Sequence, residues 1–326
     1  MIVTDSLAQI KDFASRRSLY AALGYFDGVH LGHQALLKKT AALADEAGGE
    51  PCVMLLEPHP LKVLFGPRAL NNLNTLEEKI RLIQSVGQFN VFILDFTREF
   101  AAIEPEAFVR RYLKDLLRVR GVVCGYNYSF GKMGAGKAED LRELGKKYDF
   151  TCHPVPQVTW QGRQVSSTEI RRLVEEGRML EAQEMLGHPH LYAGQVVGGN
   201  HLGSRLGFPT ANIDLPEGLV WPGYGVYAAY LATEDGRIME AIMNAGIRPT
   251  VTGDHARPSF EAHILNYSGN LYGRRLRLAL SERLRPEQMF DSFEELSAQV
   301  NKDKKKTGPA LAALSARLGL KPEEMF

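Results

Sequence analysis

The stretch Gly24-Tyr25-Phe26-Asp27-Gly28-Val29-His30-Leu31-Gly32-His33 decides how the first half of the chain folds. An apolar run of strand length, residues 19–23, precedes it. Apolar side chains at helical spacing follow it until Gly48-Gly49. The two histidines are therefore expected at the point where a buried strand turns into the first turn of a helix.

This strand-to-helix element is suited to binding phosphate. A helix start offers unpaired backbone N–H groups and the positive end of the helix dipole. Gly32 has no side chain that would keep a phosphate away from the backbone, and His30 and His33 can both donate hydrogen bonds to one phosphate group. Spacing alone leaves two other interpretations open: a histidine pair at a helix start without a ligand, and half of a metal site.

The rest of the first half alternates buried strands with helices. Strands are predicted at residues 52–56, 90–95 and 121–125, and helices at residues 76–86 and 106–117. This alternation predicts a Rossmann-like α/β domain with a parallel sheet, whose ligands bind beyond the carboxyl ends of the strands. The loops 57–60 (Glu-Pro-His-Pro) and 125–136 follow two of these strands and are candidate binding loops. A simple turn and an aromatic cap on the core are the alternatives.

A second phosphate-type element begins at Ser166-Ser167-Thr168, with Arg171 one turn later in a predicted helix that runs through Leu180. Ser166 and Glu169 have the spacing of a capping box, which is a purely structural role. Three hydroxyl groups and an arginine exceed what one cap requires. We therefore expect this helix start to hold the β- and γ-phosphates of ATP.

The pattern changes near residue 187, which predicts two domains, 1–186 and 187–326. Short β-type segments separated by turn residues then predict a small, closed or nearly closed antiparallel barrel. These strands are predicted at residues 192–197, 210–213, 225–231, 238–244, 259–265 and 276–280. A helix at 293–301 is expected to pack on the barrel. The tail is predicted to continue with a helix end, a break at 307–309 and a short amphipathic helix.

Two features of the barrel carry possible chemistry. Gly203 and Gly207 allow a phosphate to approach the backbone closely. Thr210 and Asn212 lie two positions apart on an extended strand, so they point the same way and offer hard oxygen ligands suited to magnesium. Glu261, on a later strand, could accept a proton from an attacking hydroxyl. A loop before an edge strand and a glutamate that faces solvent are the alternatives.

Global properties narrow the class of protein. The chain has 326 residues, enough for two domains, and its 39 basic residues balance its 38 acidic ones. No overall field therefore favours nucleic acid or an anionic membrane as partner. The three cysteines are far apart, the N-terminus does not read as a signal peptide, and no apolar run approaches the roughly 20 residues of a membrane span. We expect a cytoplasmic protein that is a monomer or a weak homo-oligomer.

The His-x-Gly-His element resembles the signature of adenylyl- and cytidylyltransferases, which attack a nucleoside triphosphate at its α-phosphate without a protein nucleophile. Taken together, the motifs resemble bacterial bifunctional riboflavin kinase/FMN adenylyltransferases over about residues 19–303, including 244–250, 271–273 and 284–290. The resemblance implies that the C-terminal barrel converts riboflavin and ATP to FMN and ADP. It implies that the N-terminal domain converts FMN and ATP to FAD and pyrophosphate.

The resemblance also implies the site residues. For the adenylyltransferase these are ATP contacts from Gly24, Phe26, Asp27, His30, Gly32, His33, Asn127, Ser167, Thr168 and Arg171. Flavin contacts are implied for Glu57, Pro58, His59, Pro60, Asn127 and, in the kinase, Arg285. Kinase contacts with ATP are implied for Gly203, Gly207, Pro209, Thr210 and Asn212. Mg²⁺ is implied on Thr210 and Asn212. Glu261 is implied as general base on the ribityl 5′-hydroxyl, and His30 and His33 as the catalytic α-phosphate site.

The chain departs from the family pattern at three places. Ser204 stands where many members carry arginine, with Arg205 one position later. The loop 125–136 contains Asn-Tyr-Ser-Phe rather than the commoner Asp-Phe-Arg-Phe, so its positive charge would come from Lys132 or Lys137. The tail from Lys302 to Phe326 extends beyond the family pattern. Two rival functions are a nucleotidyltransferase for another small phosphorylated acceptor, with the barrel as a binding module, and a flavin-binding protein without catalysis. The Pro-Thr-Ala-Asn stretch with Glu261 argues against the first rival, because a binding module needs neither metal ligands nor a base. The presence of His30, His33 and Glu261 argues against the second.

Overall fold

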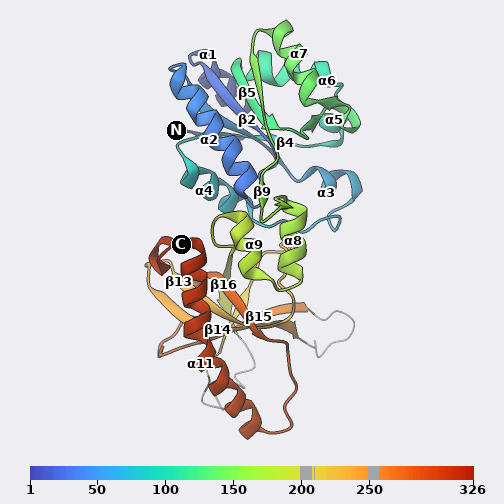
Figure 1. The fold of residues 1–326 in the computed structure, drawn as a ribbon. Helices are drawn as coiled ribbons and strands as arrows, with labels where there is room; N and C mark the ends of the chain where they lie inside the picture. Colours follow the sequence, from blue (N-terminus) through green and yellow to red (C-terminus); the bar gives the residue numbers. More distant parts are fainter. Residues whose placement is uncertain (199–207, 209, 249–256) are drawn as a thin grey trace. The chain divides into compact units, whose positions relative to one another are not determined.

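The computed structural model describes residues 1–198, 208, 210–248 and 257–326. The chain folds as two units, Met1–Ser166 and Ser167–Phe326, and each unit has its own hydrophobic core (Figure 1). The predicted boundary between residues 186 and 187 marks a change in sequence pattern and stays a prediction for the limits of the functional domains. By its contacts, the segment from Ser167 onward belongs with the barrel.

The first unit is built on a six-stranded sheet in which all neighbouring strands run parallel. The strand order is β1-β4-β3-β2-β5-β8. The strands are β1 (Val3–Thr4), β2 (Leu19–Leu23), β3 (Glu50–Glu57), β4 (Asn90–Asp95), β5 (Val119–Gly125) and β8 (Thr151–Val155). The predicted parallel α/β sheet is confirmed. The edge strands β1 and β8 were not predicted. β1 has only two residues, and β8 contains Pro154, which is unusual in a strand.

Helices cover both faces of this sheet, which is why its strands read as continuous apolar runs. One core contains Ile10, Leu113 and Leu141, and the core on the other face contains Leu37 and Ile83. The main helices are α1 (Leu7–Ser15), α2 (Leu31–Glu46), α4 (Leu76–Val86), the π-helical η1 (Val109–Leu116) and α7 (Ala138–Tyr148). The shorter elements are α3 (Pro60–Phe65), α5 (Arg98–Ala101), α6 (Pro105–Phe108), β6 (Ser129–Phe130), η2 (Lys132–Gly134), β7 (Gly136–Lys137), β9 (Thr159–Trp160) and β10 (Arg163–Gln164).

The second unit contains the predicted barrel, which closes with the antiparallel strand order β11-β12-β15-β14-β13-β16. Closure leaves no free sheet edge, and alternation places residues such as Phe260 and Ala262 in the core. The strands are β11 (Leu191–Val197), β12 (Thr210–Asp214), β13 (Gly225–Thr233), β14 (Ile238–Arg248), β15 (Arg257–Ile264) and β16 (Arg275–Arg285).

The C-terminal helix corrects one prediction. Instead of a helix ending at 301 and a break at 307–309, α11 runs without interruption from Phe293 to Leu318, followed by η3 (Pro322–Glu324). Pro309 cannot donate the usual hydrogen bond to the carbonyl four residues earlier, and both Pro309 and Lys305 are exposed, so water can take that place. On the opposite side, Leu311 and Leu314 pack on the barrel. Burial of this apolar face outweighs the missing hydrogen bond.

The helix predicted from residue 166 through Leu180 is also wrong in extent. It is two helices, α8 (Ser167–Glu175) and α9 (Met179–Leu186), separated at Gly177. Gly177 has φ +75°, a left-handed conformation that ends a helix and favours glycine. Its N–H donates to the carbonyl of Val174, and the N–H of Arg178 donates to that of Leu173. The turn therefore satisfies the carbonyls of the last helical residues.

Candidate functional site

The paired histidines lie where the sequence places them, between β2 and α2. His30 is the N-cap of α2, and its Nδ1 accepts the backbone N–H of His33 at 3.3 Å. Because Nδ1 is an acceptor, the neutral ring carries its proton on Nε2, which can donate. The two rings stack with their centroids 3.7 Å apart and an interplanar angle of 15°. One helix start thus holds both imidazoles as a pair.

The surroundings of His33 favour its neutral form. Burial, then the charge of neighbouring His30, then that of Lys79 hold the pKa of His33 well below its usual value of 6.5. Nδ1 of His33 is buried and has no hydrogen-bond partner within the described part of the chain. A buried ring nitrogen without a partner is unusual in a folded protein and fits a contact with a ligand.

Three residues near the histidine pair have structural contacts, two through packing and one through hydrogen bonds. A Cβ on Gly32 would lie 3.1 Å from the His30 ring, which is a tight contact, so a larger residue there would press on the ring. The Phe26 side chain is fully buried with its centroid 5.1 Å from that of His33, so any nucleotide contact of Phe26 would be through its backbone. The Asp27 carboxylate accepts the N–H of Leu73 at 3.0 and 3.1 Å. That contact ties the glycine turn to the 66–75 loop.

The predicted flavin loop lies beside this element. β3 ends at Glu57, and His59 caps α3 by accepting the N–H of Leu61 at 3.1 Å through Nδ1. The His59 ring lies edge-on to Tyr25, with centroids 3.9 Å apart. The structure therefore brings together the residues after β2 and the Glu57–Pro60 loop after β3, as expected for neighbouring parallel strands.

Asn127 follows β5, the neighbour of β2 on its other side, and its side chain is exposed. The carboxyl end of β5 therefore reaches the same edge of the sheet as the histidine loop. Ser167, Thr168 and Arg171 occupy the first turns of α8, which belongs to the second unit. Their role beside His30 stays a prediction.

In the barrel, the proposed metal ligands and base share one face. Asn212 on β12 is the register partner of Glu261 on β15, and Thr210 is the partner of His263. Cross-strand partners in an antiparallel sheet project on the same side, so these residues line one face. The Asn212 side-chain oxygen is buried, has no hydrogen-bond partner among the described residues, and belongs to a residue only 8% exposed. Such an oxygen fits a cation ligand.

Arg285 is held inside the protein. Its Nε donates to Asp303 at 2.9 Å, its Nη1 donates to the carbonyl of Pro286, and its guanidinium faces the Phe290 ring at 5.5 Å. Asp303 lies in the tail segment that no motif explained, and its side chain is 1% exposed. A flavin contact by Arg285 stays a prediction. Gly203, Gly207 and Pro209 lie outside the described residues.

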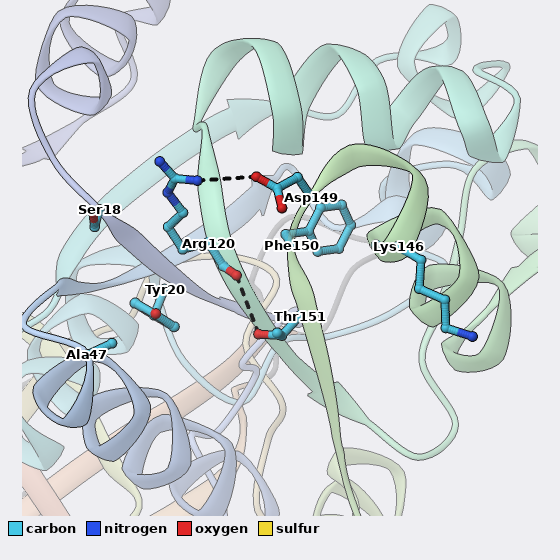
Figure 2. Close-up of a pocket in the computed structure, with 9 residues that line it drawn as sticks. Ser18, Tyr20, Ala47, Arg120, Lys146, Asp149, Phe150 and Thr151 are labelled. Atoms are coloured by element: carbon cyan, nitrogen blue, oxygen red, sulfur yellow. Dashed lines mark hydrogen bonds and ion pairs between the residues drawn. The ribbon is translucent and has the colours of Figure 1, made fainter.

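A separate pocket of about 480 Å³ lies at the opposite edge of the sheet (Figure 2). It is lined by Ser18, Tyr20 and Thr151, which lie at the amino-terminal ends of β2 and β8. Ligands of parallel sheets bind beyond the carboxyl-terminal ends of the strands. Arg120 pairs with Asp149 at 3.4 Å, as Figure 2 shows. The positive charge of this pocket is therefore largely neutralised, and none of the predicted site residues lines it.

Comparisons with known proteins decide the family. A family model described as FAD synthetase matches residues 12–169, and one described as riboflavin kinase matches residues 186–311. A bifunctional riboflavin kinase/FMN adenylyltransferase of Listeria monocytogenes is 37% identical over 90% of this chain and 92% of its own. The protein of that name in Escherichia coli K12 is 34% identical over 89% and 92%.

The chain belongs to the bifunctional riboflavin kinase/FMN adenylyltransferase family. The resemblance stated from the motifs is confirmed, with the FAD synthetase match in the α/β half and the riboflavin kinase match in the barrel half. The rival in which the barrel is only a binding module is wrong, because that part matches a kinase family. A crystal structure described as a macrolide-efflux protein of Streptococcus pneumoniae has the same fold, with a TM-score of 0.85, 28% identity and coverage of 94% and 98%. Within the described ranges, no helix here is both long and apolar enough to span a membrane.

Sequence reasoning missed Lys79, whose side chain is 1% exposed and whose Nζ contacts Glu57 at 2.6 Å. The signal was present, because Lys79 shares the buried face of α4 with Leu82 and Ile83. A lysine at a core position of an amphipathic helix indicates a specific partner. Finding that partner required the tertiary structure, since 22 positions separate the two residues.

Proposed function

We propose that each unit of this family member carries one of the two family activities, with the site residues described above. The barrel unit phosphorylates riboflavin with ATP to give FMN and ADP, and the α/β unit joins FMN to the AMP part of a second ATP to give FAD and pyrophosphate. The proposal is supported mainly by one observation: each unit has its own set of side chains suited to binding ATP or its metal ion. One set is the stacked His30–His33 pair, and the other is the Asn212–Glu261 pair.

For adenylyl transfer we assign His30 and His33 to the α-phosphate of ATP. A phosphate oxygen of FMN attacks the α-phosphorus, the bond to the β-phosphate oxygen breaks, and pyrophosphate leaves. No protein nucleophile takes part, so the protein contributes position and hydrogen bonds to the phosphoryl oxygens. The Nε2–H of His30, fixed by the cap contact of Nδ1, is one such donor. The buried His33 imidazole supplies another, with Ser167, Thr168 and Arg171 on the outer phosphates.

For phosphorylation of riboflavin we assign Glu261 as the general base. The 5′-hydroxyl oxygen of the ribityl chain attacks the γ-phosphorus while the Glu261 carboxylate takes the hydroxyl proton. The bond between the γ-phosphorus and the β-phosphate oxygen breaks, and ADP leaves. Asn212 faces Glu261 from β12, and Asn244 faces it from β14. Both amides can orient the polar groups of the substrates.

Mg²⁺ is assigned to Thr210 and Asn212. The buried, unpartnered oxygen of Asn212 and the nearby threonine hydroxyl suit this hard cation, which fills its other positions with water and nucleotide oxygens. Among the described residues, no three His, Cys, Asp or Glu side chains cluster as a metal site. A site made of hydroxyl, amide and phosphate oxygens does not need such a cluster. Bound there, the cation would neutralise charge on the phosphates of ATP.

Incubation of the protein with riboflavin, ATP and magnesium, followed by chromatographic separation of the flavins, tests the proposal. FMN should appear first and FAD should follow. Omission of magnesium should prevent formation of FMN. Failure to form FMN from riboflavin, or FAD from added FMN, would remove the corresponding activity. We also propose a cytoplasmic location and a monomeric or weakly associated state, in keeping with its free cysteines Cys52, Cys124 and Cys152.

A further inference from the structure

We propose that Lys79 is a positioning residue for adenylyl transfer, which sets the acceptor side of the site by holding Glu57 and Tyr25 against the histidine element. This inference rests on the proposed function of the α/β unit. None of the sequence motifs includes Lys79, and the inference comes from its burial and its contacts.

The location of Lys79 is the first argument. Its side chain is 1% exposed on a helix face that otherwise buries Leu82 and Ile83. Removal of an ammonium group from water is unfavourable, and a well-packed apolar residue usually stabilises a core position at least as well as an ion pair does. Stability alone therefore does not explain a lysine there. A buried lysine held by a specific partner calls for an explanation other than stability.

The contacts of Lys79 are the second argument. Nζ lies 2.6 Å from Oε1 of Glu57 and 3.9 Å from the centroid of the Tyr25 ring. The Tyr25 hydroxyl reaches the same carboxylate at 3.4 Å, and the Tyr25 ring lies against the His59 ring. One ammonium group thus joins α4, the second residue after β2 and the last residue of β3. Of these, Glu57 belongs to the flavin side of the proposed site, and Tyr25 connects it to the histidine element.

Lys79 also affects His33, on the phosphate side of the proposed site. The positive charge of Lys79 is one of the causes that keep the pKa of His33 low, after burial and His30. Lys79 therefore touches the acceptor side and acts electrostatically on the α-phosphate side. The Glu57–Lys79 pair has no net charge, so it orders the loop without placing an uncompensated charge beside the flavin.

The test compares Lys79→Met with Arg81→Met, a matched control that removes a partly exposed cation paired to Glu78 on the same helix. Steady-state adenylyl transfer is measured with FMN and with ATP varied separately. Lys79→Met should raise KM for FMN about tenfold or more and leave KM for ATP within about threefold. Arg81→Met should behave as the wild type. Riboflavin phosphorylation by the same variant and its circular dichroism report whether the chain is folded.

A folded Lys79→Met protein with KM for FMN within about twofold of wild type would overturn the proposal. If Lys79→Met does not fold, the double variant Glu57→Gln/Lys79→Met replaces it, because it leaves no buried charge unpaired, and it is compared with Glu57→Gln alone. A KM for FMN in the double variant that is several-fold above that of Glu57→Gln supports the positioning role, and an equal KM overturns it. If the wild type itself makes no FAD from FMN and ATP, the proposed function fails, and that result is separate from the behaviour of Lys79.

Discussion

At the residue scale, the two proposed sites differ in the chemical groups that they offer to ATP. The first relies on imidazoles at a helix start, where His30 is fixed by its cap contact and His33 is kept neutral by its surroundings. The second relies on a carboxylate that faces amide groups on both neighbouring strands, Asn212 and Asn244. Of the two proposed reactions, riboflavin phosphorylation is the one that removes a proton from a hydroxyl group, and Glu261 is the proposed base.

Replacement of that base should separate the two reactions. Glu261→Gln keeps the size of the side chain but cannot accept the hydroxyl proton, so riboflavin phosphorylation should fall about a hundredfold or more. Formation of FAD from added FMN should be unchanged, as measured by flavin chromatography. Glu282→Gln, at an exposed position on β16, is the control. Loss of both reactions in a folded Glu261→Gln protein would contradict the assignment of two sites.

The low pKa of His33 predicts a stability change with a definite sign. Below pH 6.5 the unfolded chain protonates this residue, whereas the folded unit keeps it neutral until a lower pH. The unfolded state then binds more protons, so stability falls as pH falls, by at most about 1.4 kcal/mol per pH unit from this group. Denaturant unfolding of wild type and His33→Gln between pH 5 and 7.5 measures the effect. A pH dependence as steep in His33→Gln as in wild type would contradict it.

At the element scale, the long helix α11 does more than cover the barrel. Asp303, on its buried side, accepts from Nε of Arg285 and from the Gln299 amide at 2.8 Å. Arg285 is the last residue of β16, and the loop that follows it belongs to the segment that resembles the family's flavin region. The helix therefore fixes the exit of β16, which gives a structural purpose to part of the tail.

Removal of this anchor should weaken the second unit. Asp303→Ala leaves the guanidinium of Arg285, 12% exposed, without its carboxylate and should cost about 3 kcal/mol in unfolding free energy. Riboflavin phosphorylation should fall as well, while FAD formation from FMN should persist. Urea unfolding and both activity assays check this result. Glu294→Ala, an exposed acid on the same helix, should cost at most about 1 kcal/mol, and equal losses in the two variants would argue against the anchor.

At the scale of the whole molecule, each unit has a separate core, with the paired histidines in the first unit and the Asn212–Glu261 pair in the second. FMN is the product of one reaction and the acceptor of the other. Nothing in the chemistry requires both steps to occur on the same chain. The two activities should therefore be separable and should complement each other.

Two variants that each lack one of the two activities should together convert riboflavin to FAD when they are mixed. Glu261→Gln should form almost no FMN from riboflavin, and His30→Ala/His33→Ala should stop at FMN. An equimolar mixture supplied with riboflavin, ATP and magnesium should make FAD, because FMN released by one protein reaches the other through solution. Chromatography of each variant and of the mixture measures this. Continued FAD formation by the double histidine variant alone would remove the histidines from the site.

The sequence alone determined the class of each half, the positions of most strands and the paired histidines. These depend on local patterns: apolar runs, strand–helix alternation and glycines at turns. Residues 76–86 and 90–95 were predicted with the observed bounds of α4 and β4. The family resemblance then supplied the two activities, which no single motif carries by itself.

Helix limits that depend on packing, and contacts between residues distant in sequence, were determined only by the tertiary structure. It joined α11 across Gly308-Pro309, because burial against the barrel outweighs one missing hydrogen bond that water replaces. It split the helix at Gly177, where a left-handed residue turns the chain. It also paired Lys79 with Glu57 and Arg285 with Asp303. A charged residue on an apolar face shows that a partner is needed, and the packing of separate elements determines which partner it finds.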